Sequence, residues 1–257
     1  MAILVTRPAP DNSATAKALT ARGYKPLLSP TLRFEAMPFY DDHGAAYDGV
    51  ILTSANAVRA VENHEFKARL VDLPTFAVGE HTAEIARAAG FKQIISAKGD
   101  AGMLRDAVAK SASAKKIKSG ATLCYLAGAD LARDLAAELG EKGFTVITHT
   151  AYRMIPVATF SDEASEAFRT ASIRAAVHYS RRSARAFIGA LRAAGVEISA
   201  LALPQICISD AVGMVLRDAG ATQVTVAREP NENALLDALD KALDKTPETL
   251  GGKSSRK

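Results

Sequence analysis

Residues 75–108 of this chain read TFAVGEHTAEIARAAGFKQIISAKGDAGMLRDAV, and they recur later as residues 205–239, QICISDAVGMVLRDAGATQVTVAREPNENALLDAL. In both copies an apolar run breaks into a helical pattern. A glycine, Gly90 or Gly220, follows where the helix is expected to end. The shared order of apolar run, turn, helix and glycine predicts one structural unit that the chain uses twice.

Two more pairs of segments repeat in the same order. Residues 3–30 resemble residues 122–149, and residues 50–61 resemble residues 176–187. The copies lie about 120 to 130 residues apart, which is too long a period for a solenoid. A chain of 257 residues is also long enough to form two hydrophobic cores. The sequence therefore predicts two similar domains.

Short runs rich in valine, isoleucine and leucine alternate with helical patterns along the chain. Unbroken apolar runs suit parallel strands covered on both faces, and the alternation predicts a doubly wound α/β fold for each domain. The predicted strands are residues 3–6, 49–53, 75–78, 93–96, 122–126, 145–148, 175–179, 205–208 and 223–226. The predicted helices include residues 13–21, 55–62, 82–89, 131–139, 183–194 and 212–219.

Composition limits the classes of partner. The formal net charge of +4 comes partly from Lys115, Lys116, Lys118 and the tail at residues 251–257, all expected to be solvated. Nucleic acid is not an expected partner, because the sequence shows no basic patch with interleaved aromatic residues. It has no run of 18 apolar residues to span a membrane, and Arg7 interrupts the short apolar start that a signal peptide would need. We therefore expect a cytoplasmic protein with no membrane partner.

Cysteine and histidine usage predicts no metal site. Cys124 and Cys207 stand inside apolar strand runs, where we expect small buried residues rather than a disulfide or reactive thiols. The five histidines show no metal-binding spacing. No glycine-rich nucleotide motif follows the first strand, since VTRPAPDNS stands at residues 5–13.

Hydroxyl residues stand where predicted strands turn into predicted helices. Loops at the carboxyl ends of parallel strands form the ligand crevice of such sheets, and helix N-termini there offer unpaired N–H groups. Any one of these residues is explained as a helix cap. Their repetition in both halves favours a ligand that carries several carboxylates or phosphates. The residues are Thr53, Ser54, Thr82, Ser180 and Ser209.

Two connections extend a strand and end near a proline, at residues 33–38 and 151–156. Proline stops a strand or helix from continuing, so both are interpreted as crossings between two lobes. Tyr152 then lies in a hinge region, where the simplest interpretation is a tyrosine packed at a domain junction.

Six motifs follow one another along the chain: ILVTRP at 3–8, VILTSANAV at 50–58, FAVGEHTAEIARAAGF at 76–91, AYR at 151–153, ICISDAVGMVLRDAG at 206–220 and AREPNENALLDAL at 227–239. As an ordered set they resemble the uroporphyrinogen-III synthase family of tetrapyrrole biosynthesis. The resemblance runs from about residue 3 to residue 239, which is nearly the whole chain.

The resemblance implies a domain arrangement that the repeat alone misses. The repeat places a boundary near Lys118, between two consecutive domains. In the family, the first strand–helix–strand unit crosses over to join the C-terminal part. Carried over, residues 1–36 and 157–247 form one α/β domain and residues 37–150 the other, with a two-stranded β-ladder joining them and a cleft between them. Residues 248–257 are then a basic flexible tail.

The resemblance also implies a reaction. The family closes linear hydroxymethylbilane to uroporphyrinogen III, inverting ring D and releasing water without a cofactor. The chain is thus expected to be a cyclising lyase on the route to haem, chlorophyll and cobalamin. Its substrate carries eight carboxylates, in keeping with the polar helix starts. Hydroxymethylbilane synthase is an expected transient partner. A monomer is expected, because no apolar patch is left uncovered by the predicted fold.

Site residues follow from the same resemblance. Tyr152 matches the tyrosine proposed in the family to assist departure of the hydroxyl, and its phenol can act as a general acid because it stays protonated at neutral pH. For Arg7, a surface ion pair is nearly as good an interpretation as a substrate carboxylate. After Ser209 the chain departs from a pattern of some members, since Ala211 and Val212 stand where a hydroxyl residue occurs. The implied substrate-binding residues are Arg7, Thr53, Ser54, Asn56, Thr82, Ser180 and Ser209.

Two other function classes are compatible with an α/β fold of two lobes. One is a non-catalytic cytoplasmic binding protein for a polyanionic small molecule. The other is a nucleotide-dependent enzyme, which the missing glycine-rich motif disfavours.

Overall fold

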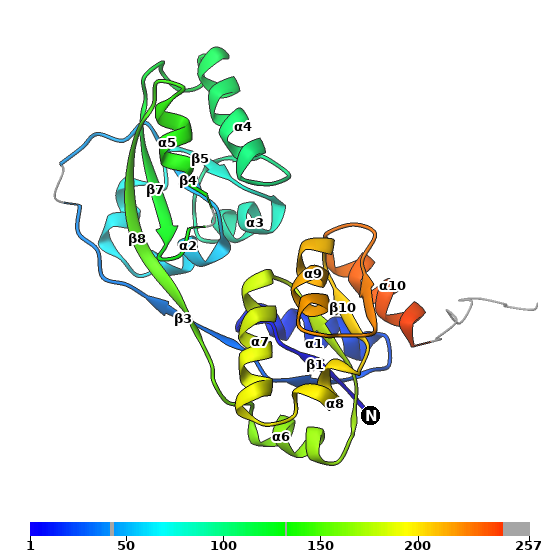
Figure 1. Ribbon diagram of the computed structural model, residues 1–257. Coiled ribbons are helices and arrows are strands. Elements are labelled where there is room, and N and C mark those ends of the chain that lie inside the picture. The colour runs from blue at the N-terminus through cyan, green and yellow to red at the C-terminus, as the bar shows by residue number, and fades with distance from the viewer. Residues whose placement is uncertain (42–43, 132, 244–257) are drawn as a thin grey trace, which may run out of the picture. The chain divides into compact units, whose positions relative to one another are not determined.

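The computed structural model describes residues 1–41, 44–131 and 133–243 (Figure 1). The chain divides into two compact units. Unit 1 combines Met1–Arg33 with the described part of Ile155–Lys257, and unit 2 is Phe34–Met154. The predicted tail at residues 248–257 lies outside the described residues, as do residues 244–247 of the predicted first domain. That each unit is a domain with the boundaries predicted above stays a prediction.

Unit 1 is built on a five-stranded parallel sheet in the order β11-β10-β9-β1-β2. Helices connect its strands, as expected for parallel neighbours, which cannot be joined by tight hairpins. The strands are β1 (Ala2–Val5), β2 (Lys25–Leu28), β9 (Ile173–His178), β10 (Gln205–Cys207) and β11 (Val224–Val226). The helices are α1 (Asp11–Ala21), α6 (Asp162–Arg169), α7 (Arg181–Ala193), α8 (Glu197–Leu201), α9 (Asp210–Asp218) and α10 (Glu232–Ala242).

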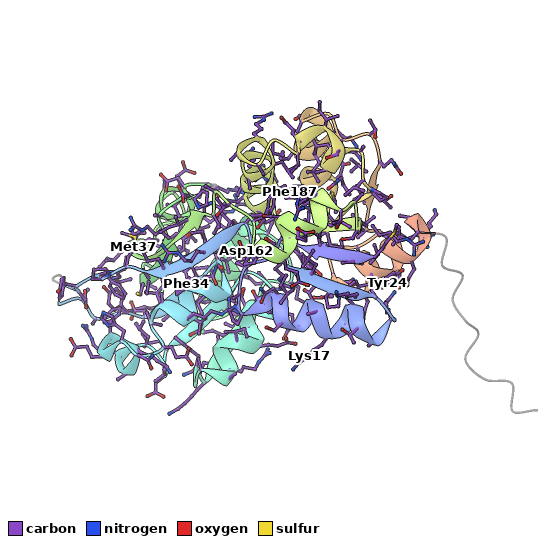
Figure 2. All side chains as sticks on the ribbon, turned by 90° about the horizontal axis from the view of Figure 1, so that it is seen from below. Lys17, Tyr24, Phe34, Met37, Asp162 and Phe187 are labelled. Atoms are coloured by element: carbon purple, nitrogen blue, oxygen red, sulfur yellow. The ribbon has the colours of Figure 1, made fainter. Side chains whose placement is uncertain are left out.

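Both faces of the unit 1 sheet are covered, because successive side chains of a strand point to opposite faces. Leu4 and Ala176 pack on one face with Phe187 of α7, which Figure 2 labels. Ile3 packs on the other face with Leu19 of α1 and with the apolar side of α10. The unbroken apolar runs predicted as strands are thus buried from both sides.

Unit 2 is built on a six-stranded sheet in the order β3-β8-β7-β4-β5-β6. The neighbouring pairs β8–β7, β7–β4, β4–β5 and β5–β6 are parallel. The strands are β3 (Leu32–Ala36), β4 (Gly49–Leu52), β5 (Pro74–Ala77), β6 (Gln93–Ser96), β7 (Thr122–Gly128) and β8 (Thr145–Pro156). The helices are α2 (Ala55–Ala60), the short 3₁₀ helix η1 (Glu65–Arg69), α3 (Glu80–Ala88), α4 (Ala101–Ser113) and α5 (Leu135–Gly140).

One face of the unit 2 sheet packs on α4 and α5. Ile51 and Leu123 of the sheet are fully buried there with Leu104 of α4 and Leu135 of α5. Helices α2 and α3 pack against each other and against β4, β5 and β7. The prediction of an α/β fold with two parallel sheets is therefore confirmed.

Strands β3 and β8 are the two segments in which the chain passes from one unit to the other. The amide of Met37 donates to the carbonyl of Ala151 (2.8 Å), and the amide of Val157 donates to the carbonyl of Thr31 (2.9 Å). Residue numbers rise along one strand as they fall along the other, so the pair is antiparallel. The strand predicted at residues 145–148 is thus too short, because β8 stays paired with β7 as far as Tyr152 and pairs with β3 as it continues to Pro156.

One predicted helix starts later than expected. The pattern at residues 131–139 indicated a helix from Leu131, but α5 begins at Leu135. The carboxylate of Asp134 accepts a hydrogen bond from the amide of Ala137 (2.9 Å) and caps the helix there. A side-chain cap inside an alanine-rich run therefore decides the boundary, rather than the apolar pattern.

The repeated glycines end their helices as predicted. Gly90 has a φ of +96° and Gly220 a φ of +98°. Side-chain-bearing residues rarely adopt such a backbone conformation, whereas glycine does so without a steric penalty. Each glycine lies two residues beyond a matching helix, α3 or α9, and leads into the next strand of its sheet.

Within the described ranges, none of the helices combines the length and apolarity that a membrane span needs.

Candidate active site

Unit 2 has a reversal of strand order between β4 and β7. From β4 the chain continues outward to β5 and β6 and then returns to the other side of β4 as β7. Open α/β sheets bind ligands outside the carboxyl ends of the strands at such a reversal. Thr53 and Ser54 directly follow β4, and Gly128 ends β7. Tyr152 lies beside Gly128 on the next strand, β8.

Tyr152 is held in an aromatic and polar environment within unit 2. Its side chain is only 8% exposed, and its ring stacks on Phe34 of β3 with centroids 6.0 Å apart. The Ser54 side chain hydrogen-bonds to the phenol and acts to lower its pKa. Burial is the larger effect, so the pKa of Tyr152 lies above the usual value of a tyrosine. The phenol is therefore neutral at physiological pH and can donate a proton.

An irregularity in β8 sets the direction of the Tyr152 side chain. Ala127 of β7 pairs with Thr150, but the next residue, Gly128, pairs with Tyr152, so Ala151 is an extra residue. The amide of Ala129 then donates to the carbonyl of Tyr152 (2.8 Å). Consecutive side chains of a regular strand point to opposite faces of the sheet, so only one of two neighbours is buried when one face is covered. Ala151 and Tyr152 are consecutive, yet both are buried. Such bulges commonly redirect a side chain beside an active site.

The start of α2 brings three of the predicted residues to the same end of the sheet. The Ser54 hydroxyl oxygen accepts a hydrogen bond from the amide of Asn56 (3.2 Å) and caps the helix. The Asn56 amide nitrogen contacts the sulfur of Met154, two residues beyond Tyr152 on β8 (3.2 Å). On the other side, the Thr53 hydroxyl lies 3.1 Å from the phenol oxygen of Tyr125. Asn56 thus contacts β8 and Thr53 contacts β7, with Ser54 between them in the chain; that these residues bind a substrate stays a prediction.

Thr82 lies in the first turn of α3 and is 5% exposed. Helix α3 packs on α2, which begins directly after Ser54. Within the described part of the chain, no hydrogen bond joins the Thr82 hydroxyl to Thr53, Ser54, Asn56 or Tyr152. The structure therefore places Thr82 on a neighbouring helix without linking it to the Tyr152 group.

In unit 1 the corresponding strand reversal lies between β1 and β9, and Arg7 follows β1 there. The Arg7 guanidinium donates to a carboxylate oxygen of Glu232 in α10 (3.0 Å) and lies 4.4 Å from the ring centre of Tyr179. The Tyr179 hydroxyl donates to the other Glu232 oxygen (3.0 Å) and accepts from Thr15 (3.2 Å). Arg7 is thus part of a connected polar cluster inside unit 1. Its pairing with Glu232 agrees with the interpretation of Arg7 as a member of an ion pair.

Ser180 and Ser209 stand before α7 and α9 in unit 1. The Ser180 hydroxyl oxygen accepts from the amide of Ser183 (3.0 Å), so it serves as a helix cap. Ser209 has an extended backbone, but its side chain makes no capping bond. Its hydroxyl differs in this respect from that of Ser180.

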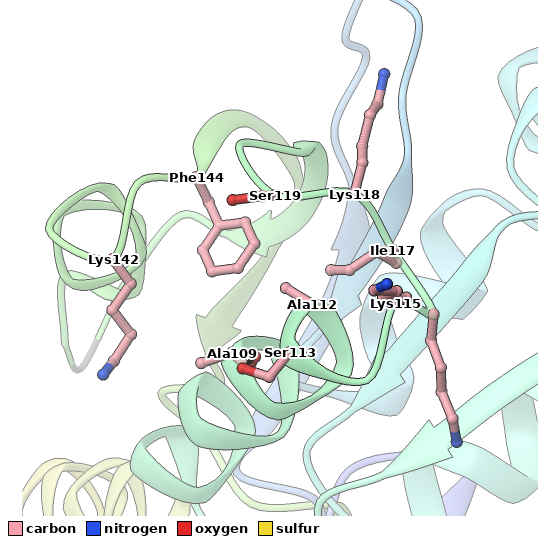
Figure 3. Close-up of a pocket in the computed structure, with 10 residues that line it drawn as sticks. Ala109, Ala112, Ser113, Lys115, Ile117, Lys118, Ser119, Lys142 and Phe144 are labelled. Carbon is pink, nitrogen blue, oxygen red and sulfur yellow. Dashed lines mark hydrogen bonds between the residues drawn. The ribbon is translucent and has the colours of Figure 1, made fainter.

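A cavity of about 780 Å³ lies elsewhere in unit 2. Phe144 and Ile117 line it, and they precede the first residues of β8 and β7. The cavity therefore lies at the end of the sheet where these strands begin, and Gly128 lies at the other end of β7. Figure 3 shows Lys118 and Lys142 extending away from Phe144 in different directions. Lys118 also pairs with Asp48 (2.9 Å). Because these two ammonium groups do not converge and one is paired with a carboxylate, they do not form an anion site in this cavity.

Both cysteines are buried, as expected. Cys124 in β7 and Cys207 in β10 are inaccessible, and burial raises the pKa of the Cys207 thiol to about 12. Neither is a reactive thiol at neutral pH. Among the residues that the structure describes, no group of three or more His, Cys, Asp or Glu side chains is placed to hold a metal ion.

Three residues at the site lie outside the sequence predictions: Phe34, Tyr125 and Gly128. Phe34 stacks on Tyr152, Tyr125 contacts Thr53, and Gly128 lies beneath the Tyr152 ring. The only signal in the sequence was that Gly128 ends an apolar strand run, which does not show what lies above it. These contacts join residues on different strands and depend on the fold.

Comparisons with known proteins place the chain in a family. The model of the family described as uroporphyrinogen-III synthase HemD matches residues 13–237. A search of curated proteins returns no match. Among solved structures, the fold is similar to uroporphyrinogen-III synthetase from Helicobacter pylori 26695, with a TM-score of 0.63, 18% identity, and 94% of this chain and 99% of that chain covered.

A mutant uroporphyrinogen III synthase from the extremely thermophilic bacterium Thermus thermophilus is similar in the same way. Its TM-score is 0.59 at 16% identity, with 96% of this chain and 100% of that chain covered. Identities this low support the fold, whereas the family model spans most of the sequence itself. The chain therefore belongs to the uroporphyrinogen-III synthase family.

Proposed function

We propose that this protein closes hydroxymethylbilane to uroporphyrinogen III, with inversion of ring D and loss of water. Its family comprises the cyclising lyases that perform this step of tetrapyrrole biosynthesis. The family match over residues 13–237 supports the reaction, and it leaves the alternative of a non-catalytic binding protein without a supporting observation.

Tyr152 is the general acid of this proposal, and its buried, neutral phenol is the observation that carries the role. The phenol donates its proton to the hydroxyl of the hydroxymethyl group, the C–O bond breaks, and water leaves. The resulting azafulvene cation is attacked by the α-carbon of ring D that already carries the bridge to ring C, which gives a spiro intermediate. The bond from this carbon to the ring C methylene then breaks and leaves a second azafulvene cation. The other α-carbon of ring D attacks this cation, so the ring is inverted as the macrocycle closes. The proton released when the macrocycle regains aromatic pyrroles balances the one that Tyr152 gave up.

The hydrogen bonds around Ser54 support this direction of proton transfer. Its oxygen already accepts from the amide of Asn56. The Ser54 side chain also favours the phenolate and so acts to lower the Tyr152 pKa. The phenol proton is then available to a substrate hydroxyl, and Ser54 stabilises the charge that develops on the oxygen as the proton leaves.

Thr53, Ser54, Asn56 and Thr82 in unit 2, and Arg7, Ser180 and Ser209 in unit 1, are the proposed binding groups for the substrate. Ser209 is supported by a hydroxyl that does not cap its own helix. Arg7 is already paired with Glu232, so a substrate carboxylate competes with that residue. Arg7 is therefore expected to contribute less affinity than an unpaired arginine.

The test is a coupled assay without added cofactor. Hydroxymethylbilane is generated freshly and given to the purified protein, and the oxidised products are separated into isomers I and III by chromatography. The proposal predicts isomer III in clear excess over isomer I, which forms spontaneously. Isomer I alone, from protein shown to be folded, would overturn the enzymatic function.

Three further expectations stay predictions. They are the transient contact with hydroxymethylbilane synthase, the monomeric state and the cytoplasmic location.

A further inference from the structure

Gly128 leaves space that the Tyr152 phenol occupies. An ideal Cβ built on Gly128 would lie 2.8 Å from Cζ of Tyr152, 3.0 Å from Cε2 and 3.0 Å from the phenol oxygen. A real Cβ essentially never lies closer than 3.0 Å to a heavy atom, so a side chain here would displace the reactive end of the ring. We propose that Gly128 is a positioning residue for Tyr152 in the reaction.

Backbone conformation does not explain a glycine at this position. Gly128 is absent from the described residues with positive φ, so alanine can adopt its backbone. The residue is buried at the end of a strand, where glycine is otherwise disfavoured relative to residues with a side chain. The close approach of Tyr152 is therefore the physical reason for the missing side chain.

The ring cannot move away from a new methyl group without losing other contacts. Phe34 stacks on it, and the bulge at Ala151 ties the backbone of Tyr152 to Gly128 and Ala129. Ser54, at the start of α2, is close enough to the phenol to act on its pKa. A methyl group at residue 128 pushes on Cζ and on the oxygen, and so displaces the hydroxyl while the ring stays buried.

The consequence for the reaction rests on the proposed role of Tyr152. Proton donation needs the phenol oxygen within hydrogen-bond reach of the leaving hydroxyl, and misplacement by about 1 Å can cost roughly 100-fold in rate. Gly128 touches no substrate atom in this account and acts only through the placement of Tyr152.

The experiment is a double-mutant cycle in the coupled assay. Gly128→Ala is compared with wild type, and Gly128→Ala/Tyr152→Phe is compared with Tyr152→Phe. We expect Gly128→Ala to lower kcat by about 10- to 100-fold with little change in KM. In the Tyr152→Phe background, which has no hydroxyl to misplace, it should lower kcat by less than about 2-fold. Gly140→Ala is the matched control, because Gly140 also lies in unit 2 and has open space around its Cβ position.

A second readout does not depend on activity. In protein labelled with ¹³C at tyrosine Cζ, the Tyr152 resonance is assigned by its loss in Tyr152→Phe. It should shift in Gly128→Ala and stay unchanged in Gly140→Ala.

The outcomes separate the two proposals. Two results would overturn the positioning role alone. One is that Gly128→Ala lowers kcat by the same factor with and without the Tyr152 hydroxyl. The other is that Gly128→Ala keeps the wild-type kcat while Tyr152→Phe lowers it. Wild-type kcat in Tyr152→Phe would instead remove the general acid, and the role of Gly128 in the reaction with it.

If Gly128→Ala does not fold, the unfolding free energy of Gly128→Ala/Tyr152→Ala is compared with that of Tyr152→Ala. Equal values show that the ring is the obstacle and support the inference, whereas a large loss in the double variant overturns it.

Discussion

Tyr152 shows how one residue acquires a chemical role from its surroundings. Exposed phenols have a pKa near 10 and are weak acids at neutral pH. Burial against Phe34 raises that pKa further, while the Ser54 hydroxyl partly opposes the rise by favouring the phenolate. The result is a proton donor that stays protonated at neutral pH.

Removing the phenol hydroxyl should slow the reaction but leave its outcome unchanged. We expect Tyr152→Phe to lower kcat for isomer III by about 100-fold, at the low end of general acid catalysis, because the site still folds the substrate. The measurement is the initial rate of isomer III formation in the coupled assay. Tyr40→Phe is the control, since Tyr40 is 83% exposed. Wild-type activity of Tyr152→Phe would contradict the assignment.

The raised pKa of Tyr152 predicts the pH dependence of the reaction. A general acid is lost as the pH rises through its pKa, and here that pKa lies above about 10. No fall in kcat caused by Tyr152 should therefore appear between about pH 7 and pH 9. Initial rates of wild type and Tyr152→Phe across this range test the point. A falling limb below pH 9 that disappears in the variant would contradict it.

At the scale of elements, the repeat noticed in the sequence is a repeat of structure. Strand, helix, closing glycine and strand follow one another as β5–α3–Gly90–β6 and as β10–α9–Gly220–β11. The two glycines differ in φ by only 2°, from +96° to +98°. Local patterns sufficed to predict these elements, because helix ending at a glycine is a property of a few adjacent residues.

Two glycine substitutions should have opposite effects on stability. Gly220→Ala forces a Cβ into a backbone with φ of +98° and should lower the unfolding free energy by about 1–2 kcal/mol. Gly189→Ala lies inside α7 and should raise it by up to about 1 kcal/mol. Both Cβ positions in unit 1 have open space around them, so only backbone conformation differs. Urea unfolding measures both, and a loss of equal size in the two variants would contradict the argument.

Element boundaries were predicted less well than element types. Strand β8 is 12 residues long, whereas the predicted strand ended at residue 148 and residues 151–156 were interpreted as a connection that extends it. The added length pairs with β7 as far as Tyr152 and also with β3, whose sequence is more than 100 residues away. Helix α5 begins late because Asp134 caps it. In both cases a partner outside the apolar pattern sets the end of the element.

At the scale of the whole molecule, a buried histidine couples folding of unit 1 to pH. His178 at the end of β9 is fully buried, and burial lowers its pKa to about 4. The Gln205 amide nitrogen donates to two backbone carbonyls, so its oxygen accepts from Nε2 of His178 (2.9 Å). The folded protein thus holds this imidazole neutral.

Stability should therefore fall on acidification. The unfolded chain binds a proton at His178 below about pH 6.5, whereas the folded chain resists it until about pH 4, so the unfolding free energy decreases as the pH falls through this window. The contribution of His178 is on the order of 2 kcal/mol between pH 6.5 and 4.5. Urea unfolding at the two pH values measures it. His178→Gln should flatten the dependence on pH. An unchanged slope in this variant would contradict the assignment.

The amino-acid sequence by itself determined the α/β class, the duplicated unit, the burial of the strands and the set of polar residues at the strand ends. These features depend on periodicity and on a few neighbouring residues, and such local patterns predict them. The family resemblance added Tyr152 as the catalytic candidate, which the apolar pattern could not single out.

Tertiary structure decided how that tyrosine is placed. Phe34, Ser54, Gly128 and Tyr152 come from four different parts of the chain, and strand pairing brings them together. The bulge at Ala151 and the space above Gly128 exist only because β7 and β8 pair in one register. Register, and the side-chain contacts that follow from it, depend on the packing of the whole sheet, so no local pattern in the sequence could show them.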